Sequence, residues 1–315
     1  MSEPTLVVTG LAKAYGDLRA VADLSFEVAA GETFGLLGPN GAGKTTSISM
    51  ICGLLAPDAG EVRVEGVPIR PGSTAGRDLI GYVPQELALY PDMSGYDNLV
   101  FFGRLYGLKG AEAKRRIAET LEVVGLTDRA GDRVKEYSGG MQRRLNIAAG
   151  LLHQPALLIL DEPTVGIDPQ SRNAILEAVA ALGDQGMSVL YTTHYMEEAE
   201  RLCRRVGIVD HGRMLACGTR RELVDLVGQH DQVTITLSGN AAHVAQALNA
   251  ADDGVLEVSA TDDRTVVCMV AGASSHLPGL VNALSDAGAQ VTDLRVEEPS
   301  LDSVFLHITG TALRD

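Results

Sequence analysis

Tryptophan is absent from this chain of 315 residues, aromatic residues make up only 4%, and negative charges outnumber positive ones. Because hydrophobic residues still account for 45%, the core must be built from aliphatic side chains. The formal net charge of −15 argues against nucleic acid as a partner, since binding to a phosphate backbone needs clustered lysine and arginine. It also argues against direct adsorption to anionic lipid.

Cysteine pairs and long apolar runs are also missing. The cysteines form no C-x-x-C pair and lack a histidine at metal-site spacing, which predicts reduced thiols rather than disulfides or zinc ligands: Cys52, Cys203, Cys217 and Cys268. The acidic start at residues 1–4 lacks the basic-then-apolar pattern of a signal peptide. No apolar stretch reaches the roughly 20 residues that span a bilayer. We therefore expect a soluble chain that needs a partner for any membrane role.

What is present is a pattern of strands and helices that predicts an α/β domain over residues 1–228. Short strands dominate residues 5–38, 61–67 and 80–83. Residues 86–153 carry helical periodicity and predict a helical insertion, with helices over 96–106, 111–124 and 140–153. The fully apolar run Leu157–Leu160 is typical of a central parallel strand.

Residues 229–315 differ in pattern and in charge. The order strand, helix, strand, strand, helix, strand predicts a small α+β domain of ferredoxin-like type. This segment has no lysine and contributes nine of the fifteen net negative charges. It carries no cluster that resembles a metal or acid–base site. We expect an accessory or regulatory domain here, although a passive stabilising role is an alternative.

A glycine-rich loop links the predicted strand Thr33–Leu37 to a helix. Residues 38–45 match G-x-x-x-x-G-K-[ST] at every specified position, in the strand–loop–helix context of a phosphate-binding loop. Its backbone N–H groups and the positive end of the helix dipole favour phosphate oxygens, whereas a chance glycine turn is the alternative. The expected nucleotide contacts are Gly38, Pro39, Asn40, Gly41, Ala42, Gly43, Lys44, Thr45 and Thr46. Lys44 can reach the β- and γ-phosphates of ATP, and Thr45 can hold Mg²⁺.

Two acids follow the apolar run Leu157–Leu160. Ligands of open α/β sheets bind at the carboxyl ends of the strands, so Asp161 is expected to bind Mg²⁺. Glu162 is expected to polarise the water that attacks ATP. Alone, such a pair is often only a strand end and a turn. Beside a phosphate-binding loop, it predicts ATP hydrolysis.

A second glycine pair, Gly139 and Gly140, follows Ser138 at the start of a predicted helix. Such a start can bind an anion, although Ser138 can equally be an ordinary N-cap. The glycine-rich loop at residues 38–45 already provides a site for one phosphate chain. The start at Ser138 is therefore a possible second anion site.

Taken together, residues 5–228 resemble the nucleotide-binding subunit of an ABC transporter. The resemblance implies that the predicted strands form a P-loop NTPase fold, with a mixed sheet and an antiparallel β subdomain. It also implies that Tyr15 stacks on adenine, that Gln85 contacts Mg²⁺ and water, and that His194 lies near the γ-phosphate. Residues 138–142 match the family signature Leu-Ser-Gly-Gly-Gln, which implies that Ser138, Gly139 and Gly140 bind ATP from the partner chain. Tyr137 and Met141 depart from that signature. Asp168 matches the loop that crosses the dimer interface.

The final segment resembles a narrower group. Residues 297–310 are similar to the ending of drug-exporter ATPases of the daunorubicin-resistance type, the ABC-2 exporters. An amphipathic helix with an apolar stripe of Leu301, Val304, Phe305 and Ile308 would account for the same pattern, and both interpretations can hold at once.

The resemblance implies a homodimer that encloses two MgATP and drives membrane permease subunits encoded by a separate gene. It places the chain at the cytoplasmic face of the membrane, attached through the permease, with a drug, antibiotic or other hydrophobic cargo. An exporter of lipid or polysaccharide and an importer are alternatives. A soluble ABC ATPase acting on DNA or ribosomes would show basic patches, a long heptad insertion or tandem ATPase domains, and a non-catalytic regulator would lack Glu162 or His194.

Overall fold

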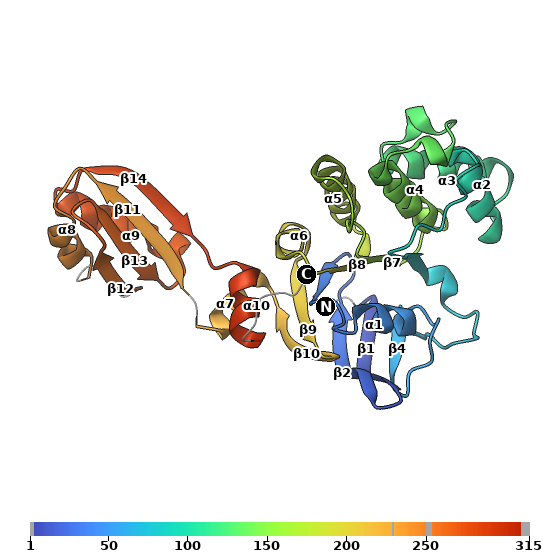
Figure 1. Ribbon diagram of the computed structural model, residues 1–315, viewed down its shortest axis with the longest axis horizontal. Helices are drawn as coiled ribbons and strands as arrows, with labels where there is room; N and C mark the ends of the chain where they lie inside the picture. Colours follow the sequence, from blue (N-terminus) through green and yellow to red (C-terminus); the bar gives the residue numbers. More distant parts are fainter. Residues whose placement is uncertain (1–2, 229, 250–253, 310–315) are drawn as a thin grey trace. The chain divides into compact units, whose positions relative to one another are not determined.

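The chain forms two compact units, the first ending at Arg220 and the second beginning at Arg221 (Figure 1). The computed structural model describes residues 3–228, 230–249 and 254–309. The boundary proposed from the sequence, at residue 228, follows the short helix α7 (Arg220–Leu226) of the second unit. No helix in these three ranges is long and apolar enough to cross a membrane.

The first unit is organised by a mixed sheet in the order β5-β4-β1-β2-β10-β9-β3-β8-β7-β6. Its parallel part consists of β6 (Ile80–Val83), β7 (Leu157–Asp161), β8 (Ser188–Thr193), β3 (Thr33–Leu37) and β9 (Arg205–Asp210). Its antiparallel part, the predicted β subdomain, consists of β1 (Leu6–Tyr15), β2 (Leu18–Val28), β4 (Ala59–Val64) and β5 (Val67–Pro68). A single pairing of β10 (Arg213–Gly218) with β2 joins the two parts.

Two apolar cores lie on opposite faces of the parallel strands. Alternate residues of β7 explain why this strand is apolar throughout. Leu157 and Ile159 pack with α1 (Lys44–Ile51) and the antiparallel strands, whereas Leu158 and Leu160 pack with the helical layer. A central parallel strand buried on both faces has no polar side, which is the pattern that the sequence predicted.

The helical insertion contains three helices, α2 (Gly95–Leu105), α3 (Gly110–Val123) and α4 (Gly139–Leu151), with short 3-10 turns at Thr127–Arg129 and Val134–Glu136. The predicted helices differ from these by one or two residues at their ends. Serine side chains cap two of them, since Ser94 Oγ accepts from the N–H of Asp97 at 3.0 Å, and Ser138 caps α4 in the same way.

The chain then completes the α/β pattern with α5 (Pro169–Asp184) and α6 (Met196–Leu202). Another 3-10 turn, Arg77–Leu79, precedes β6. Strands β9 and β10 form the predicted hairpin, which turns at His211 and Gly212. The amide N–H of Gly212 donates to the carbonyl of Ala42 at 3.0 Å, so this hairpin is hydrogen-bonded to the glycine-rich loop.

The second unit has the predicted strand and helix order, in an antiparallel sheet β12-β13-β11-β14. Its elements are β11 (Asp231–Leu237), α8 (Ala241–Leu248), β12 (Val255–Ala260), β13 (Thr265–Val270), α9 (Ala273–Asp286), β14 (Val291–Glu297) and α10 (Leu301–Thr309). The sheet order confirms the ferredoxin-like prediction. Leu301, Val304 and Phe305 of α10 are buried, as the apolar stripe predicted, whereas Gly310, the end of the matching tail segment, lies outside the described residues.

Candidate functional site

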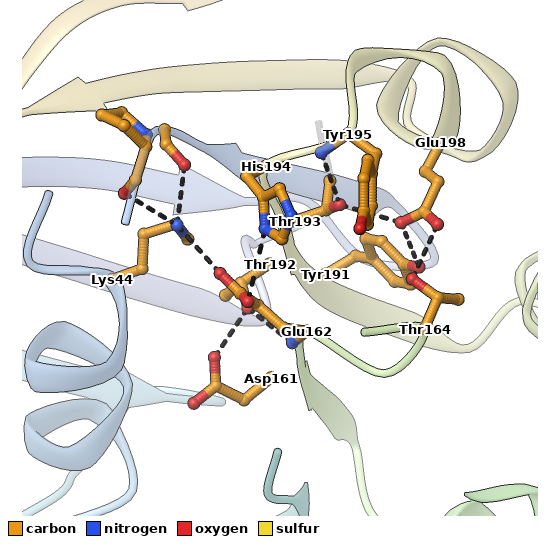
Figure 2. Close-up of polar contacts among 12 residues, drawn as sticks. Lys44, Asp161, Glu162, Thr164, Tyr191, Thr192, Thr193, His194, Tyr195 and Glu198 are labelled. Atoms are coloured by element: carbon orange, nitrogen blue, oxygen red, sulfur yellow. Dashed lines mark hydrogen bonds and ion pairs between the residues drawn. The ribbon is translucent and has the colours of Figure 1, made fainter. Parts of the chain in front are cut away.

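The glycine-rich loop surrounds the ammonium group of Lys44. Lys44 Nζ donates to the carbonyls of Gly38 at 2.7 Å and Pro39 at 3.1 Å, and lies 3.0 Å from Oε1 of Glu162 (Figure 2). Its side chain is only 4% exposed. A buried ammonium needs acceptors or an opposite charge, and here the loop and Glu162 supply both.

Glycine is required in this loop for reasons of space and backbone conformation. A Cβ at Gly38 would lie 2.1 Å from the carbonyl oxygen of Val209, and a Cβ at Gly43 would lie 2.3 Å from that of Ala20. Gly41 and Gly43 also have φ values of +83° and +98°, which L-residues rarely adopt. The loop conformation that turns N–H groups inward is therefore available only to this sequence pattern.

Asp161 ends β7 with a carboxyl group that is almost entirely buried. Its Oδ1 accepts from the Thr192 hydroxyl at 2.7 Å, whereas its Oδ2 has no hydrogen-bond partner in the part of the chain that the structure describes. Burial raises the pKa of Asp161, and the nearby Glu162 raises it further against the effect of the Thr192 hydrogen bond. A bound divalent cation would satisfy the orphaned oxygen and favour the charged form, so the residue fits a magnesium ligand.

Glu162 has a left-handed backbone, with φ at +45°, which aims its side chain toward Lys44 and His194. Its N–H donates to the same Thr192 hydroxyl at 2.9 Å. Its second carboxyl oxygen, Oε2, lies 3.4 Å from Nδ1 of His194, which follows β8 (Figure 2). Strained backbone of this kind persists only where its surroundings hold it, and it is concentrated at functional sites.

A cavity of about 400 Å³ opens beside these groups. It is lined by residues from the loop, from β1 and β2, and from the ends of other strands: Tyr15, Leu18, Arg19, Ala20, Asn40, Gly41, Gly43, Lys44, Thr45, Thr46, Gln85, Glu162 and His211. Tyr15 is 51% exposed, so its ring is available to a ligand rather than buried in the sheet. The structure therefore brings Tyr15, Gln85, Glu162 and six loop residues to one cavity, as the sequence predicted. The other predicted residues do not line it: Gly38, Pro39, Ala42, Asp161 and His194.

Two cationic or titratable residues at this cavity, Arg19 and His211, carry no sequence signal for it. Arg19 lies on β2, in the hairpin that pairs it with Ala14 beside Tyr15, but it was given no role from the sequence, and His211 was identified only as part of a turn. The hydrogen bond from Gly212 to Ala42 places that turn beside the glycine-rich loop. The position of His211 is therefore revealed only by contact between distant segments.

Ser138 and Gly139 do not line the cavity of the same chain. Ser138 is exposed at the start of α4, where its hydroxyl accepts from the N–H of Met141 at 3.2 Å. Gly140 is buried, and a Cβ there would lie 2.2 Å from the Cβ of Ser171 on α5. This serine and its two glycines therefore present a helix start outside the cavity.

The two departures from the family signature have structural roles. Tyr137 is buried, and its hydroxyl donates to the carbonyl of Arg129 at 2.6 Å. Met141 packs against the helical core. Asp168 caps α5 by accepting from the N–H of Ser171 at 3.0 Å, and these backbone bonds lower its pKa.

Comparisons with known proteins show the family of this chain. Residues 21–165 match the family model described as ABC transporter. Linearmycin resistance ATP-binding protein LnrL of Bacillus subtilis is 46% identical over 98% of this chain and 100% of its own length. Daunorubicin resistance ATP-binding protein DrrA3 of Streptomyces coeruleorubidus is 40% identical over 98% and 97% of the two chains. Nod factor export ATP-binding protein I of Paraburkholderia xenovorans is 39% identical over the full length of both.

Solved structures show the same fold. The structure described as the ATP binding subunit of an ABC transporter superposes with a TM-score of 0.64 at 32% identity, covering 71% of this chain and 93% of the other. The cbiO1 protein of Clostridium perfringens, described as part of the ABC transporter complex cbiONQ, gives 0.65 at 27% identity, covering 72% and 94%.

Proposed function

This chain belongs to the ABC transporter family as an ATP-binding and ATP-hydrolysing protein, and we propose that it drives export through a separate membrane permease. The observation that carries the proposal is the meeting of Lys44, Asp161 and Glu162 beside one cavity, at the carboxyl ends of parallel strands. Its volume of about 400 Å³ is in the range of small-molecule sites.

ATP is proposed to bind with its phosphates in the glycine-rich loop and its adenine on the exposed ring of Tyr15. The first-turn N–H groups of α1 have no intrahelical partners and face the loop, where a phosphate chain can accept from them. Asn40, Gly41, Thr45 and Thr46 line the same cavity. Mg²⁺ would be held by Thr45, Gln85 and Asp161, and would neutralise charge on the phosphate oxygens.

Hydrolysis is assigned to Glu162, with His194 beside it. Glu162 is paired with Lys44 at 3.0 Å. Phosphate oxygens compete for that ammonium group, and its attraction to them leaves the carboxylate free to accept a proton from water. His194, 3.4 Å from Glu162, is proposed to contact the terminal phosphate. ATP binding thereby prepares the base that acts on it.

A second copy is proposed to complete each site. Ser138 and Gly139 form an exposed helix start that lies away from the cavity of their own chain, and such starts attract anions. Two copies arranged around a two-fold axis would place these residues against the ATP of the partner. Closing on ATP and opening after hydrolysis would then move the permease, at the cytoplasmic face of the membrane.

The cargo is proposed from the names of full-length relatives. Those named for linearmycin and daunorubicin resistance support a drug or antibiotic. The relative named for Nod factor export supports a second candidate, an exporter whose cargo is not a drug, such as a lipid or polysaccharide.

Mixing two inactive variants tests the composite site. Lys44→Ala removes the phosphate contact, and Ser138→Arg blocks the exposed helix start. A heterodimer of the two has one intact site, so an equal mixture should recover about a quarter of the wild-type rate of phosphate release, because half of random symmetric pairs are mixed. Replacing the first partner by the double variant Lys44→Ala, Ser138→Arg removes every intact site and should stay inactive. A mixture no more active than its components would refute the shared site.

A further inference from the structure

A completely buried carboxylate lies behind the catalytic groups. Glu198, on α6, has a side chain that is 0% exposed, and it accepts hydrogen bonds from Thr164, Tyr191 and Thr193 (Figure 2) and from Arg172. Its Oε1 accepts from Thr164 Oγ1 and from Arg172 Nε, both at 2.6 Å. Its Oε2 accepts from Tyr191 Oη at 2.9 Å and Thr193 Oγ1 at 2.8 Å. Four donors from three segments, the turn after β7, helix α5 and strand β8, thus converge on one group.

The hydrogen-bonding capacity of the Glu198 carboxylate is fully used, which fixes the positions of its four donors. A carboxylate offers about four lone-pair positions, and each oxygen here accepts two bonds. A buried charge with fewer partners would be strongly destabilising. Burial raises the pKa of Tyr191, and the negative charge of Glu198 raises it further. The phenol therefore keeps its proton and remains a hydrogen-bond donor. The donors cannot leave without exposing an unpaired charge.

The donors are adjacent in sequence to the proposed catalytic residues. Thr164 lies two residues after Glu162, and Thr193 immediately precedes His194. The Thr193 hydroxyl also accepts from the N–H of Tyr195 at 2.9 Å, so the backbone on both sides of His194 is tied to Glu198. We propose that Glu198 is a positioning residue that holds Glu162 and His194 in one mutual geometry.

The same carboxylate connects this pair to α5. Arg172 lies in the first turn of that helix, which Asp168 caps. The Arg172 guanidinium carbon is 4.4 Å from the centroid of the Tyr195 ring, and that ring is 4.1 Å from the His194 ring. A shift at the start of α5 therefore reaches His194 through both the ion pair and the contact between the two tilted rings.

The inference rests on the proposed roles of Glu162 and His194, and its test separates positioning from general stabilisation. Glu198→Gln keeps the shape but weakens the bond to Arg172 and reduces the number of acceptor positions. We expect kcat for ATP hydrolysis to fall about 10- to 100-fold, because small displacements of reacting groups have effects of this size. KM and directly measured ATP affinity should stay within about twofold, since the glycine-rich loop is untouched.

A double-mutant cycle with His194→Ala supplies the decisive readout. If Glu198 acts through His194, the loss of kcat in the double variant will be smaller than the product of the single losses, because the residue being positioned is gone. Glu32→Gln is the matched control. Glu32 has a side chain only 2% exposed and accepts from Arg205 Nε at 2.8 Å, away from the catalytic groups. It should lower the melting temperature but leave kcat within about twofold.

Several outcomes would overturn the inference. A lower melting temperature with unchanged kcat in Glu198→Gln would show that Glu198 only stabilises the fold. A double variant whose loss of kcat equals the product of the two single losses would show that Glu198 does not act through His194. If Glu198→Gln does not fold, Thr164→Val and Tyr191→Phe remove single donors, and unchanged kcat in both would likewise show that Glu198 only stabilises the fold. Full activity in Glu162→Gln and His194→Ala would refute the proposed function itself. Loss of activity in those two with none in Glu198→Gln would refute only the positioning role.

Discussion

The two units both pack helices on a sheet, yet among the residues that the structure describes, buried charged side chains are found only in the first. Strands β3, β7 and β8 run parallel, so the segments that follow them meet at one edge of the sheet. The sheet of the second unit is antiparallel, and neighbouring strands end at opposite edges. Strand direction, more than the supply of acidic residues, therefore decides where chemistry can be assembled.

Burial separates the units as clearly as topology. Buried charged groups of the first unit include Lys44, Asp161, Glu162 and Glu198, whereas every residue in the main core of the described second unit is apolar. The second unit is acidic, so its charge lies on a solvated surface. We propose that residues 229–315 hold two subunits together or govern their cycle without taking part in the chemistry.

Among single substitutions, Glu162→Gln in the first unit should change ATP hydrolysis the most, compared with a control substitution in the second unit. Removal of the general base should lower phosphate release by about 100- to 10,000-fold. ATP binding should persist, because the glycine-rich loop is intact. Glu257→Gln, an exposed acid on β12 of the second unit, is the control and should behave as wild type. Steady-state phosphate assays and nucleotide titration would measure both, and normal turnover in Glu162→Gln would contradict the assignment.

Lys44→Ala should weaken ATP binding itself by about 10- to 100-fold, the effect of losing a bond between charged groups. Direct titration of nucleotide is the measurement. Arg264→Ala removes an exposed cation from the second unit and should leave the affinity unchanged. Equal affinities for the two variants would mean that the phosphates do not bind in this loop.

Asp161→Asn should raise the melting temperature of the metal-free protein at neutral pH, because it removes the cost of burying a charged carboxylate. The rise should be roughly 2–4 °C for each kcal/mol of unfolding free energy gained. The raised pKa of Asp161 means that its protonated form favours folding, so this contribution is present at low pH and lost as pH rises through the folded pKa. The advantage of the variant should therefore disappear as pH falls. Melting curves recorded over a range of pH would check this dependence. Melting curves with and without MgATP would check the role of Asp161 as a metal ligand, because the stabilisation by MgATP should be smaller in Asp161→Asn.

Deletion of residues 229–315 should have the smallest effect on the nucleotide site, with ATP affinity within about threefold of the full chain, because every residue lining the cavity precedes the cut. Sedimentation should show weaker self-association, or transport in cells should fall more than ATP binding. A folded truncation that loses ATP affinity would place part of the site in the second unit. Unchanged association and transport would favour a passive cap.

Local sequence determined the parts of the site that lie within one strand–loop–helix segment. The steric demands at Gly38 and Gly43 and the charge of Lys44 belong to one short stretch, so a motif was sufficient to predict them. The acids after β7 were predictable for the same reason, since an apolar strand ends where its polar residues begin. The start of α4 was predictable from Ser138 as an N-cap, whereas the Ser94 cap of α2 is seen only in the structure.

Tertiary structure alone decided which distant residues support that site. Nothing near Glu198 in the sequence indicates that it accepts from Thr164 and Arg172, which lie 34 and 26 residues earlier. The placement of His211 at the cavity likewise depends on how β10 pairs with β2 and β9. A motif records the conformational needs of adjacent residues, whereas burial and hydrogen bonding between segments depend on strand order, which arises only when the chain packs around both cores.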